Sequence, residues 1–211
     1  MKTLYLVRHA KSSWKYPDLD DFERPLNKRG RKSAPFMGKV LKKLKVAPDL
    51  VISSPANRAA MTARIIAAAI NYPLENIRYS ETIYEFSEKA LIKVVKQIDD
   101  TVNETMVVGH NPALNGLANY IGDQPISNIP TGGVFCVDLD VLSWADIRKH
   151  CGRLKFFEFP KKLPNKIKSS KQGSDTQCTR RANAGTRRAI FINCSAGGSN
   201  VNPRLVRVRI H

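Results

Sequence analysis

Short apolar runs alternate with amphipathic segments from the start of the chain to about residue 163. The apolar runs have the length and the content of β-branched and aromatic residues that are typical of buried strands. They predict strands at residues 3–7, 50–53, 105–108, 134–139 and 154–159. Between the runs, apolar residues recur at the i, i+3, i+4, i+7 spacing that forms one face of a helix. This spacing predicts helices at residues 37–44, 91–98 and 114–121.

An alanine-rich stretch at residues 57–70 predicts a fourth helix, and Pro35 predicts a kink or a late start in the first one. Because strands alternate with helices, we expect a three-layer α/β/α sandwich with a mostly parallel central sheet. A chain of 211 residues is long enough for one such domain with appendages. We place the domain at residues 1–163 and a basic tail at residues 164–211.

The positive charge of the chain is unevenly distributed. The formal net charge is +17, and residues 164–211 hold ten Lys or Arg against one acidic residue, which gives the tail +9 and leaves +8 for residues 1–163. The excess in the domain favours anionic substrates or acidic partner surfaces. The tail mixes Ser, Asn, Gly and Arg, which predicts disorder. We favour the interpretation that the tail is a dispensable extension, or translated sequence outside the natural domain, and binding of nucleic acid or an acidic partner through its arginine pairs is the less favoured alternative.

The sequence offers no good candidate for a signal peptide or for a membrane-spanning segment. Only four apolar residues separate Lys2 from Arg8, which is too few for a signal peptide, and no later run approaches a membrane span. We therefore expect a cytoplasmic protein without membrane contact. Four cysteines stand far apart without paired spacing, so we expect free thiols rather than a zinc site or a disulfide framework. They are Cys136, Cys151, Cys178 and Cys194.

Polar and basic residues follow three of the predicted strands. Arg8 and His9 follow the first strand, and Ser53–Pro55 with Arg58 follow the second. The sequence Gly-His-Asn-Pro at residues 109–112 follows the strand at 105–108. In an open parallel sheet, the ends where strands give way to helices line the binding crevice. We therefore expect two histidines and two arginines at one edge of the sheet.

This set of side chains suits a phosphoryl group. Guanidinium groups bind phosphoryl oxygens bidentately, and N–H groups at helix starts add positive potential. Asn111 is expected as an N-cap and Pro112 as the first helical residue. Clustered positive charge lowers the pKa of a neighbouring histidine and keeps it neutral and nucleophilic. A lone histidine is more often structural, but the repetition at successive strand ends favours phosphoryl transfer through a phosphohistidine.

Four separated motifs carry a resemblance to a known family. In this order and spacing, LVRHAKS, RPLNKRG, ISSPANRAAMTA and VVGHNP resemble the histidine phosphatase superfamily, which has the phosphoglycerate mutase-like fold, and specifically its small SixA-type phosphohistidine phosphatases. The match runs from about residue 2 to residue 160 and does not cover the tail. The superfamily's usual Arg-His-Gly reads Arg8-His9-Ala10 here, and Ala followed by Lys-Ser is typical of the SixA branch. The resemblance implies a domain that lacks a large cap insertion.

The resemblance also implies roles for single residues. His9 would be the nucleophile that becomes phosphorylated, Arg8 and Arg58 would hold the phosphoryl oxygens, and His110 would donate a hydrogen bond to them. Asn111 is assigned to phosphate binding beside His110. No metal and no cofactor is implied, and a phosphate or sulfate ion is expected to bind in the pocket.

Three residues have open roles at the rim of this pocket. Arg24 either faces the pocket or pairs with Asp21 to fix the loop, and we slightly favour the structural role. Lys11 and Ser12 either line the entrance or are simply exposed to solvent.

The general acid is the least defined part of the site. Larger superfamily members take a carboxylic acid from an inserted region after the third strand, and the matching interval here, RYSETIYEFSEKAL, is short. Glu81 and Glu85 are the candidates, with Glu85 preferred because it follows the apolar pair Ile83-Tyr84, and a plain surface carboxylate is the alternative. An open site fits a protein-borne phosphohistidine better than an enclosed sugar phosphate.

Other phosphate chemistries find little support. No cysteine is followed at the sixth position by Arg, and no glycine-rich nucleotide loop occurs. Asp138 and Asp140 weakly resemble an aspartate-nucleophile motif, but too little chain follows them, and we expect them on a turn or a strand edge. The sequence therefore predicts a metal-independent phosphatase, monomeric, that acts on a phosphohistidine-bearing protein such as a phosphorelay domain. The alternatives are a hydrolase of small phosphate monoesters and a non-catalytic module that binds phosphorylated proteins.

Overall fold

The computed structural model describes residues 1–162, and the predicted tail lies outside the described residues. The strands of this part are β1 (Lys2–Arg8), β2 (Leu50–Ser53), β3 (Arg78–Tyr79), β4 (Glu104–Gly109), β5 (Val134–Leu139) and β6 (Gly152–Glu158). Its α-helices are α1 (Lys28–Lys43), α2 (Asn57–Ala69), α3 (Glu88–Lys96) and α4 (Ala113–Ile121). Its 3-10 helices are η1 (Asp21–Glu23), η2 (Leu74–Asn76), η3 (Glu81–Ile83) and η4 (Trp144–Asp146).

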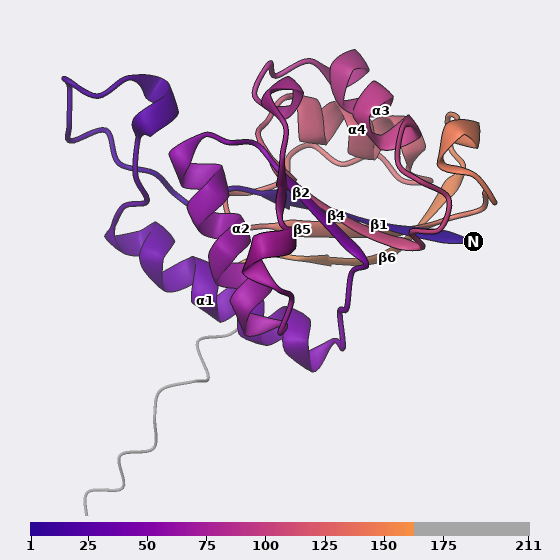
Figure 1. Cartoon of the computed structure of the whole chain (residues 1–211), viewed down its shortest axis with the longest axis horizontal. Coiled ribbons are helices and arrows are strands. Elements are labelled where there is room, and N and C mark those ends of the chain that lie inside the picture. Colours follow the sequence, from indigo (N-terminus) through magenta and orange to yellow (C-terminus); the bar gives the residue numbers. More distant parts are fainter. Residues whose placement is uncertain (163–211) are drawn as a thin grey trace, which may run out of the picture. The chain divides into compact units, whose positions relative to one another are not determined.

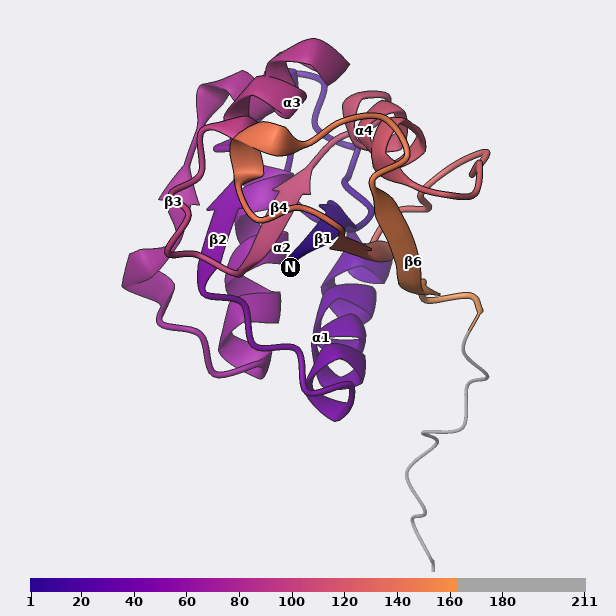
Figure 2. The same ribbon diagram turned by 90° about the vertical axis from the view of Figure 1, so that its right-hand side faces the viewer.

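The strands form one sheet in the order β3-β2-β4-β1-β5-β6. Strands β1 to β4 are parallel, whereas β5 runs antiparallel to both β1 and β6. Helices α1 and α2 cover one face of the sheet, and α3 and α4 cover the other (Figures 1 and 2). The expected three-layer α/β/α sandwich with a mostly parallel sheet is confirmed.

Alternate side chains of β1 enter two separate cores, one on each face of the sheet. Leu4 and Leu6 lie in the core beneath α3 and α4, which includes Leu114. Val7 lies in the core beneath α1 and α2, which includes Met37. All five side chains are fully buried, and burial of each contributes about 1.5–3 kcal/mol. Because both faces of the central strands are covered, these strands are continuously apolar rather than alternating.

Helix α1 differs from its prediction at both ends. It begins at Lys28, where the side chain of Asn27 caps it by accepting a hydrogen bond of 2.9 Å from Gly30 N, so Pro35 lies inside the helix and does not delay its start. Leu44, expected on the apolar face, is 46% exposed because the helix ends at Lys43. The chain turns after it, and Val46 enters the core instead.

Strand β3 was not predicted, because its two residues are exposed and show no apolar run. Residues 80–87 alone connect β3 to α3, which agrees with the expected absence of a large cap insertion. Asp140 lies on the bend after β5, as expected, whereas Asp138 lies within β5, an internal strand, where it pairs with Lys155 at 3.1 Å.

Two expectations about the whole chain are tested in part. None of the described helices is both long enough and apolar enough to cross a membrane. Cys136 and Cys151 are buried free thiols, whereas Cys178 and Cys194 lie outside the described residues.

Candidate active site

The ends of three neighbouring parallel strands bring the candidate residues together. In the sheet register, Arg8 at the end of β1 pairs with Gly109 at the end of β4, and Ser53 of β2 pairs with Val108 of β4. His9 N donates a hydrogen bond of 3.0 Å to the carbonyl oxygen of Gly109. The residues that follow these strands therefore emerge at the same edge of the sheet, as the sequence predicts.

His9 has one ring nitrogen engaged. Its Nδ1 lies 2.8 Å from the carbonyl oxygen of Ala10, and because a carbonyl only accepts, Nδ1 carries the proton. Burial, together with the charges of Arg58 and Arg8, lowers the pKa of His9 to about 4, although the hydrogen bond to Ala10 acts to raise it. His9 is thus neutral at pH 7, and Nε2 carries an available lone pair.

His110 is oriented by Ser54. Its Nε2 lies 2.9 Å from the Ser54 hydroxyl oxygen, which also accepts a hydrogen bond from Ala56 N at 3.3 Å. No other acceptor is recorded in the described part of the chain for the buried Ser54 hydroxyl, so this hydroxyl donates to Nε2 and the ring proton of His110 lies on Nδ1. Burial first, and then the charges of His9 and Arg58, lower the pKa of His110 to about 3.

The Nδ1 atom of His110 is a buried donor without a partner among the described residues. The ring lies directly beside the expected nucleophile, because the ring centroids of His9 and His110 are 5.0 Å apart. Such orphaned donors are rare in native structures and mark places where a ligand group can be accepted.

Arg8 is held from the loop that precedes β5. Its Nη1 donates to the side-chain oxygen of Asn128 at 3.1 Å and to the carbonyl oxygen of Ile129 at 2.8 Å, while its Nε is a second buried donor without a recorded partner. Burial lowers the pKa of the Arg8 guanidinium from its usual value. The loop therefore fixes one end of the guanidinium and leaves Nε available.

Asn111 has a different local role from the one expected. It does not cap α4, because Pro112 occupies the N-cap position and no side-chain hydrogen bond caps the helix. The Asn111 side chain instead donates to Asn128 at 2.9 Å and to the carbonyl oxygen of Ile129 at 3.3 Å. Its own oxygen is buried without a recorded partner. Asn111 thus ties the α4 side of the site to the same loop that holds Arg8.

Arg58 lies in the first turn of α2 with only 3% of its surface exposed. Its guanidinium donates to the backbone oxygen of Asp21 and, at 2.7 Å, to the Asp21 carboxylate, which also accepts from the Tyr84 hydroxyl at 3.1 Å. Burial acts to raise the pKa of the Asp21 carboxyl, but the hydrogen bonds of Arg24 and Arg58 outweigh it and hold the pKa below its usual value. Ionised Asp21 therefore fixes Arg58.

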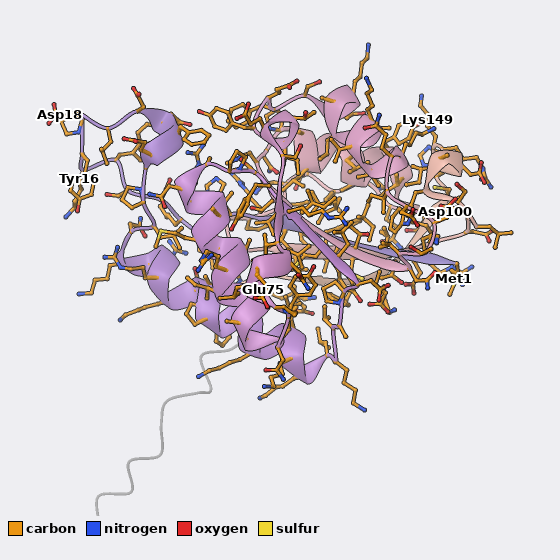
Figure 3. The ribbon with its side chains drawn as sticks, in the orientation of Figure 1. Met1, Tyr16, Asp18, Glu75, Asp100 and Lys149 are labelled. Atoms are coloured by element: carbon orange, nitrogen blue, oxygen red, sulfur yellow. The ribbon has the colours of Figure 1, made fainter. Side chains whose placement is uncertain are left out.

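Arg24 stabilises the base of the loop that follows β1. It pairs with Asp21 at 2.6 Å, donates to the Ser12 hydroxyl at 2.7 Å, and stacks on Trp14, with its guanidinium carbon 3.1 Å from the ring centroid. Tyr16 lies at the far tip of this loop, away from the sheet (Figure 3). These contacts agree with the structural role favoured for Arg24. They also make Ser12 a buried partner of Arg24 rather than an exposed residue.

Lys11 is exposed, and no side-chain hydrogen bond or ion pair is recorded for it within residues 1–162. Its backbone oxygen accepts a hydrogen bond of 3.0 Å from Asn27 N. A Cβ atom at Gly30 would overlap this oxygen, so the loop approaches α1 more closely than any residue but glycine allows. The position of Lys11 is thus set by its backbone.

Two aromatic residues, rather than a carboxylate, face His110 from the segment after β3. The ring centroids of Tyr84 and Phe86 lie 5.8 and 5.1 Å from that of His110. Glu85, the preferred candidate acid, lies between them in sequence and is exposed, as is Glu81. Within the described part of the chain, no hydrogen bond or ion pair joins Glu85 to any site residue. The structure brings the flanking rings to the site and leaves the carboxylate in solvent.

Several residues at the site were not singled out from the sequence. The sequence patterns place Ser54 only at a strand end and Tyr84 only as an apolar neighbour of Glu85, and they indicate no role for Asn128, Phe22 or Phe86. The loop of Asn128 reaches Arg8 because β5 pairs antiparallel with β1, and no sequence pattern indicated that pairing. The apolar residues Ile83, Tyr84 and Phe86 in the otherwise polar segment after β3 are the available signal for the rings at the site.

The arrangement is chemically suited to an oxyanion. Neutral His9 offers a nucleophilic nitrogen, the ring of His110 lies 5.0 Å from its ring, and His110 Nδ1 and Arg8 Nε are buried donors without recorded partners. Arg58, which Asp21 holds in place, is near enough for its charge to lower the pKa values of both His9 and His110. Donors that are buried and already oriented stabilise negative charge on a bound group more strongly than donors in water.

Comparison with known proteins agrees with the sequence motifs. Residues 4–87 match the family model described as the histidine phosphatase superfamily, branch 1. An uncharacterised protein of Mycobacterium tuberculosis is 31% identical over 166 residues, covering 74% of this chain and 100% of the relative. An uncharacterised protein of Mycobacterium leprae is 30% identical over 167 residues, covering 74% of this chain and 100% of the relative.

Solved structures share the same architecture. The "putative phosphohistidine phosphatase SixA" from Agrobacterium tumefaciens is 28% identical, with a TM-score of 0.65, and the match covers 75% of this chain and 98% of that one. A structure of the protein histidine phosphatase SixA complexed with tungstate is 20% identical, with a TM-score of 0.62, and the match covers 77% of this chain and 99% of that one.

Proposed function

Because this chain belongs to the histidine phosphatase superfamily, in its SixA-type branch, we propose that it removes phosphoryl groups from protein-borne phosphohistidine through an intermediate on His9. One observation carries the proposal. The ring centroid of neutral His9 lies 5.0 Å from that of His110, whose Nδ1 is a buried donor without a recorded partner, as is Nε of the adjacent residue Arg8. Unpartnered donors next to a nucleophile are what a phosphoryl-binding pocket requires.

In the first step, the lone pair of His9 Nε2 attacks phosphorus. The bond between phosphorus and the substrate imidazole breaks, and its electron pair stays on that imidazole nitrogen. When the other nitrogen of the substrate ring carries a proton, the imidazole leaves neutral, so a strong enzymic acid is not required. A reaction that requires no strong enzymic acid agrees with the exposed position of Glu85. Arg8, Arg58 and His110 donate to the phosphoryl oxygens and stabilise their charge.

In the second step, water attacks the phosphorus carried by His9. The new oxygen–phosphorus bond forms as the bond to Nε2 breaks, and the electron pair returns to the imidazole. The water loses a proton to solvent or to the phosphate product, and neutral His9 is restored. Because the Ala10 carbonyl keeps the proton on Nδ1 throughout, Nε2 is presented unprotonated for each cycle.

The neighbour that carries tungstate supports an oxyanion site in this fold. Tungstate is a tetrahedral oxyanion like phosphate, and we propose that the same edge of the sheet binds phosphate, or sulfate in its place, in this chain. The short connection at residues 80–87 supports access by a protein-borne group rather than a fully enclosed small molecule.

Trapping of the phosphoenzyme tests the proposal. A peptide that carries ³²P-phosphohistidine should label the wild-type chain in an acid-labile, base-stable linkage, and His9→Asn should abolish both label and turnover. His150→Asn is the matched control, because His150 lies outside the site with Nδ1 on the carbonyl oxygen of Gly122. Full activity of His9→Asn would refute the mechanism.

A substrate panel distinguishes the remaining alternatives. With chelator present, the phosphohistidine peptide should be hydrolysed faster than an alkyl phosphate. The reverse order would favour a hydrolase of small phosphate monoesters, and tight binding without turnover would favour a non-catalytic module.

We also propose that residues 1–163 carry this activity without the tail. Every residue of the mechanism lies in that segment. A chain truncated after Leu163 should therefore keep the stability and the turnover of the full chain. A loss of either would assign the tail a role in the domain.

A further inference from the structure

Three aromatic side chains form a continuous wall beside the site, and we call Phe22, Tyr84 and Phe86 the aromatic wall. The ring centroids of Phe22 and Tyr84 are 5.2 Å apart, with the rings edge to face, and those of Tyr84 and Phe86 are 5.3 Å apart. Phe86 and Tyr84 both contact His110. The wall is built from two segments far apart in sequence, the loop after β1 and the connection between β3 and α3.

The aromatic wall does not belong to the hydrophobic core of the domain. Phe22 is 39% exposed and Phe86 is 37% exposed, and neither packs into the clusters on the two faces of the sheet. Rings of this size usually bury their surface, because each carries a large apolar area. An exposed group of rings next to a polar site therefore indicates a surface that a ligand covers.

Phe86 reaches its position at a cost in backbone energy. Its φ angle is 57°, in the left-handed region that bulky side chains rarely adopt. Ser87, which follows it, caps α3 by accepting from Ala90 N. Such a conformation costs about 1 kcal/mol or more and persists where the surroundings require it. Here the strained residue carries the ring of the aromatic wall that stands closest to His110.

The aromatic wall also lies next to the groups that would hold a phosphoryl group. The Tyr84 ring centroid is 6.0 Å from the guanidinium carbon of Arg58, and the His110 ring centroid is 5.0 Å from that of His9. A substituent on phosphorus lies opposite the attacking His9 nitrogen, outside the groups that hold the phosphoryl oxygens. The aromatic wall borders these groups through its contacts with His110 and Arg58.

We propose that the aromatic wall is a subsite for a planar, unsaturated ring attached to the phosphoryl group. This inference rests on the proposed function of His9, and it adds a selection by ring shape that the oxyanion site itself does not provide. Offset or edge-to-face contacts between aromatic rings are worth about 0.5–1.5 kcal/mol beyond the area that they bury. An imidazole or a phenyl ring gains these contacts, and a saturated ring of similar size does not.

Two non-hydrolysable probes isolate this selection from turnover. Phenylphosphonate and cyclohexylphosphonate carry the same oxyanion and similar apolar area, but only the first has a planar ring. Binding is measured by calorimetry on the full chain, with inorganic phosphate as a third ligand. We expect phenylphosphonate to bind about threefold to tenfold more tightly than cyclohexylphosphonate.

Substitutions identify the surface responsible. Phe86→Leu and Phe22→Leu keep apolar bulk but remove the rings, and each should reduce the phenyl preference while leaving the affinity for inorganic phosphate within about twofold. Tyr120→Leu, in the last turn of α4, removes a ring elsewhere and should keep the preference. Thermal unfolding of each variant establishes that it is folded.

The outcomes separate the subsite from the proposed function. Equal affinity for both phosphonates, or a preference that survives in the Phe22→Leu/Phe86→Leu double variant, overturns the subsite while the oxyanion site stands. Failure to bind inorganic phosphate and both phosphonates overturns the oxyanion site and the subsite with it. A phenyl preference that disappears only when the wall is changed supports the subsite.

Discussion

The hydroxyl oxygen of Ser54 lies 2.9 Å from Nε2 of His110, and this contact decides which nitrogen of His110 carries the proton. With its proton donated to Nε2, Ser54 leaves the His110 proton on Nδ1, which is the atom without a recorded partner. Ser54 thus converts a histidine of ambiguous tautomer into an oriented donor. Strand β2, which ends at Ser53, is the rigid element that positions it.

Replacement of Ser54 by Ala should lower kcat about tenfold, which corresponds to the loss of about one buried hydrogen bond. Without the hydroxyl, His110 can place its proton on Nε2 and present a lone pair to the phosphoryl oxygens. The ¹⁵N chemical shifts of the His110 ring should then move from the Nδ1–H pattern toward a mixture of tautomers. An unchanged tautomer in Ser54→Ala would contradict the role given to the hydroxyl.

Ser53→Ala is the matched control for that experiment. Ser53 is equally buried and lies one residue earlier, but its hydroxyl donates to the carbonyl oxygen of Ser54 at 2.9 Å and not to His110. A purely structural effect of losing a buried hydroxyl at this strand end should appear in both variants. The shift in the His110 ring signals should appear in Ser54→Ala alone.

Replacement of Arg24 by Ala should destabilise the loop between β1 and α1. Arg24 is 7% exposed and holds Ser12, Ser13 and Asp21 through hydrogen bonds, so its loss leaves several polar partners unsatisfied. We expect the free energy of unfolding to fall by about 2 kcal/mol and limited proteolysis within residues 13–24 to become faster. Lys28→Ala, at an exposed position, should change neither.

The elements that hold the site were predictable because their signals are local. The apolar run that forms β1, the strand before His110 and the helical faces each occur within a few residues, so periodicity located them. The convergence of Arg8, His9, Arg58 and His110 also followed, because parallel strands place their carboxyl ends at one edge. The four sequence motifs then indicated the histidine phosphatase superfamily.

The supporting contacts were not predictable, because they depend on tertiary pairing. Asn128 meets Arg8 only through the antiparallel pairing of β5 with β1, which has no local signature. The preference for Glu85 was based on neighbouring apolar residues, but the backbone turn at Phe86 directs the rings, and not the carboxylate, to His110. Hydrophobic periodicity does not predict where a side chain points when a neighbouring residue has a strained backbone conformation.

Replacement of Glu85 by Gln should leave hydrolysis of phosphohistidine within about twofold of wild type, because an exposed carboxylate without contacts contributes little. The measurement is kcat and kcat/KM on a phosphohistidine peptide and on an alkyl phosphate. Glu81→Gln serves as the comparison, since Glu81 is exposed in the same segment. A loss of tenfold or more for Glu85→Gln alone would restore it as the general acid.

The buried neutral state of His110 should make folding stability depend on pH. Burial lowers its pKa to about 3 in the folded chain, whereas an unfolded histidine titrates near 6.5. As the pH falls below about 6.5, His110 becomes protonated in the unfolded state but stays neutral in the folded state until about pH 3. This contribution to stability is therefore complete above about pH 6.5 and is lost progressively as the pH falls toward 3.

The difference in unfolding free energy between wild type and His110→Asn measures this contribution directly. Between pH 7.5 and pH 5 the difference should decrease by about 2 kcal/mol, because 1.4 kcal/mol corresponds to one pH unit below the unfolded pKa. Ser53→Ala removes no titratable group, so its difference from wild type should stay constant over the same range. Denaturant unfolding at several pH values provides the data. A difference that stays constant for His110→Asn as well would mean that His110 titrates alike in the folded and unfolded chains, which is incompatible with a buried neutral donor.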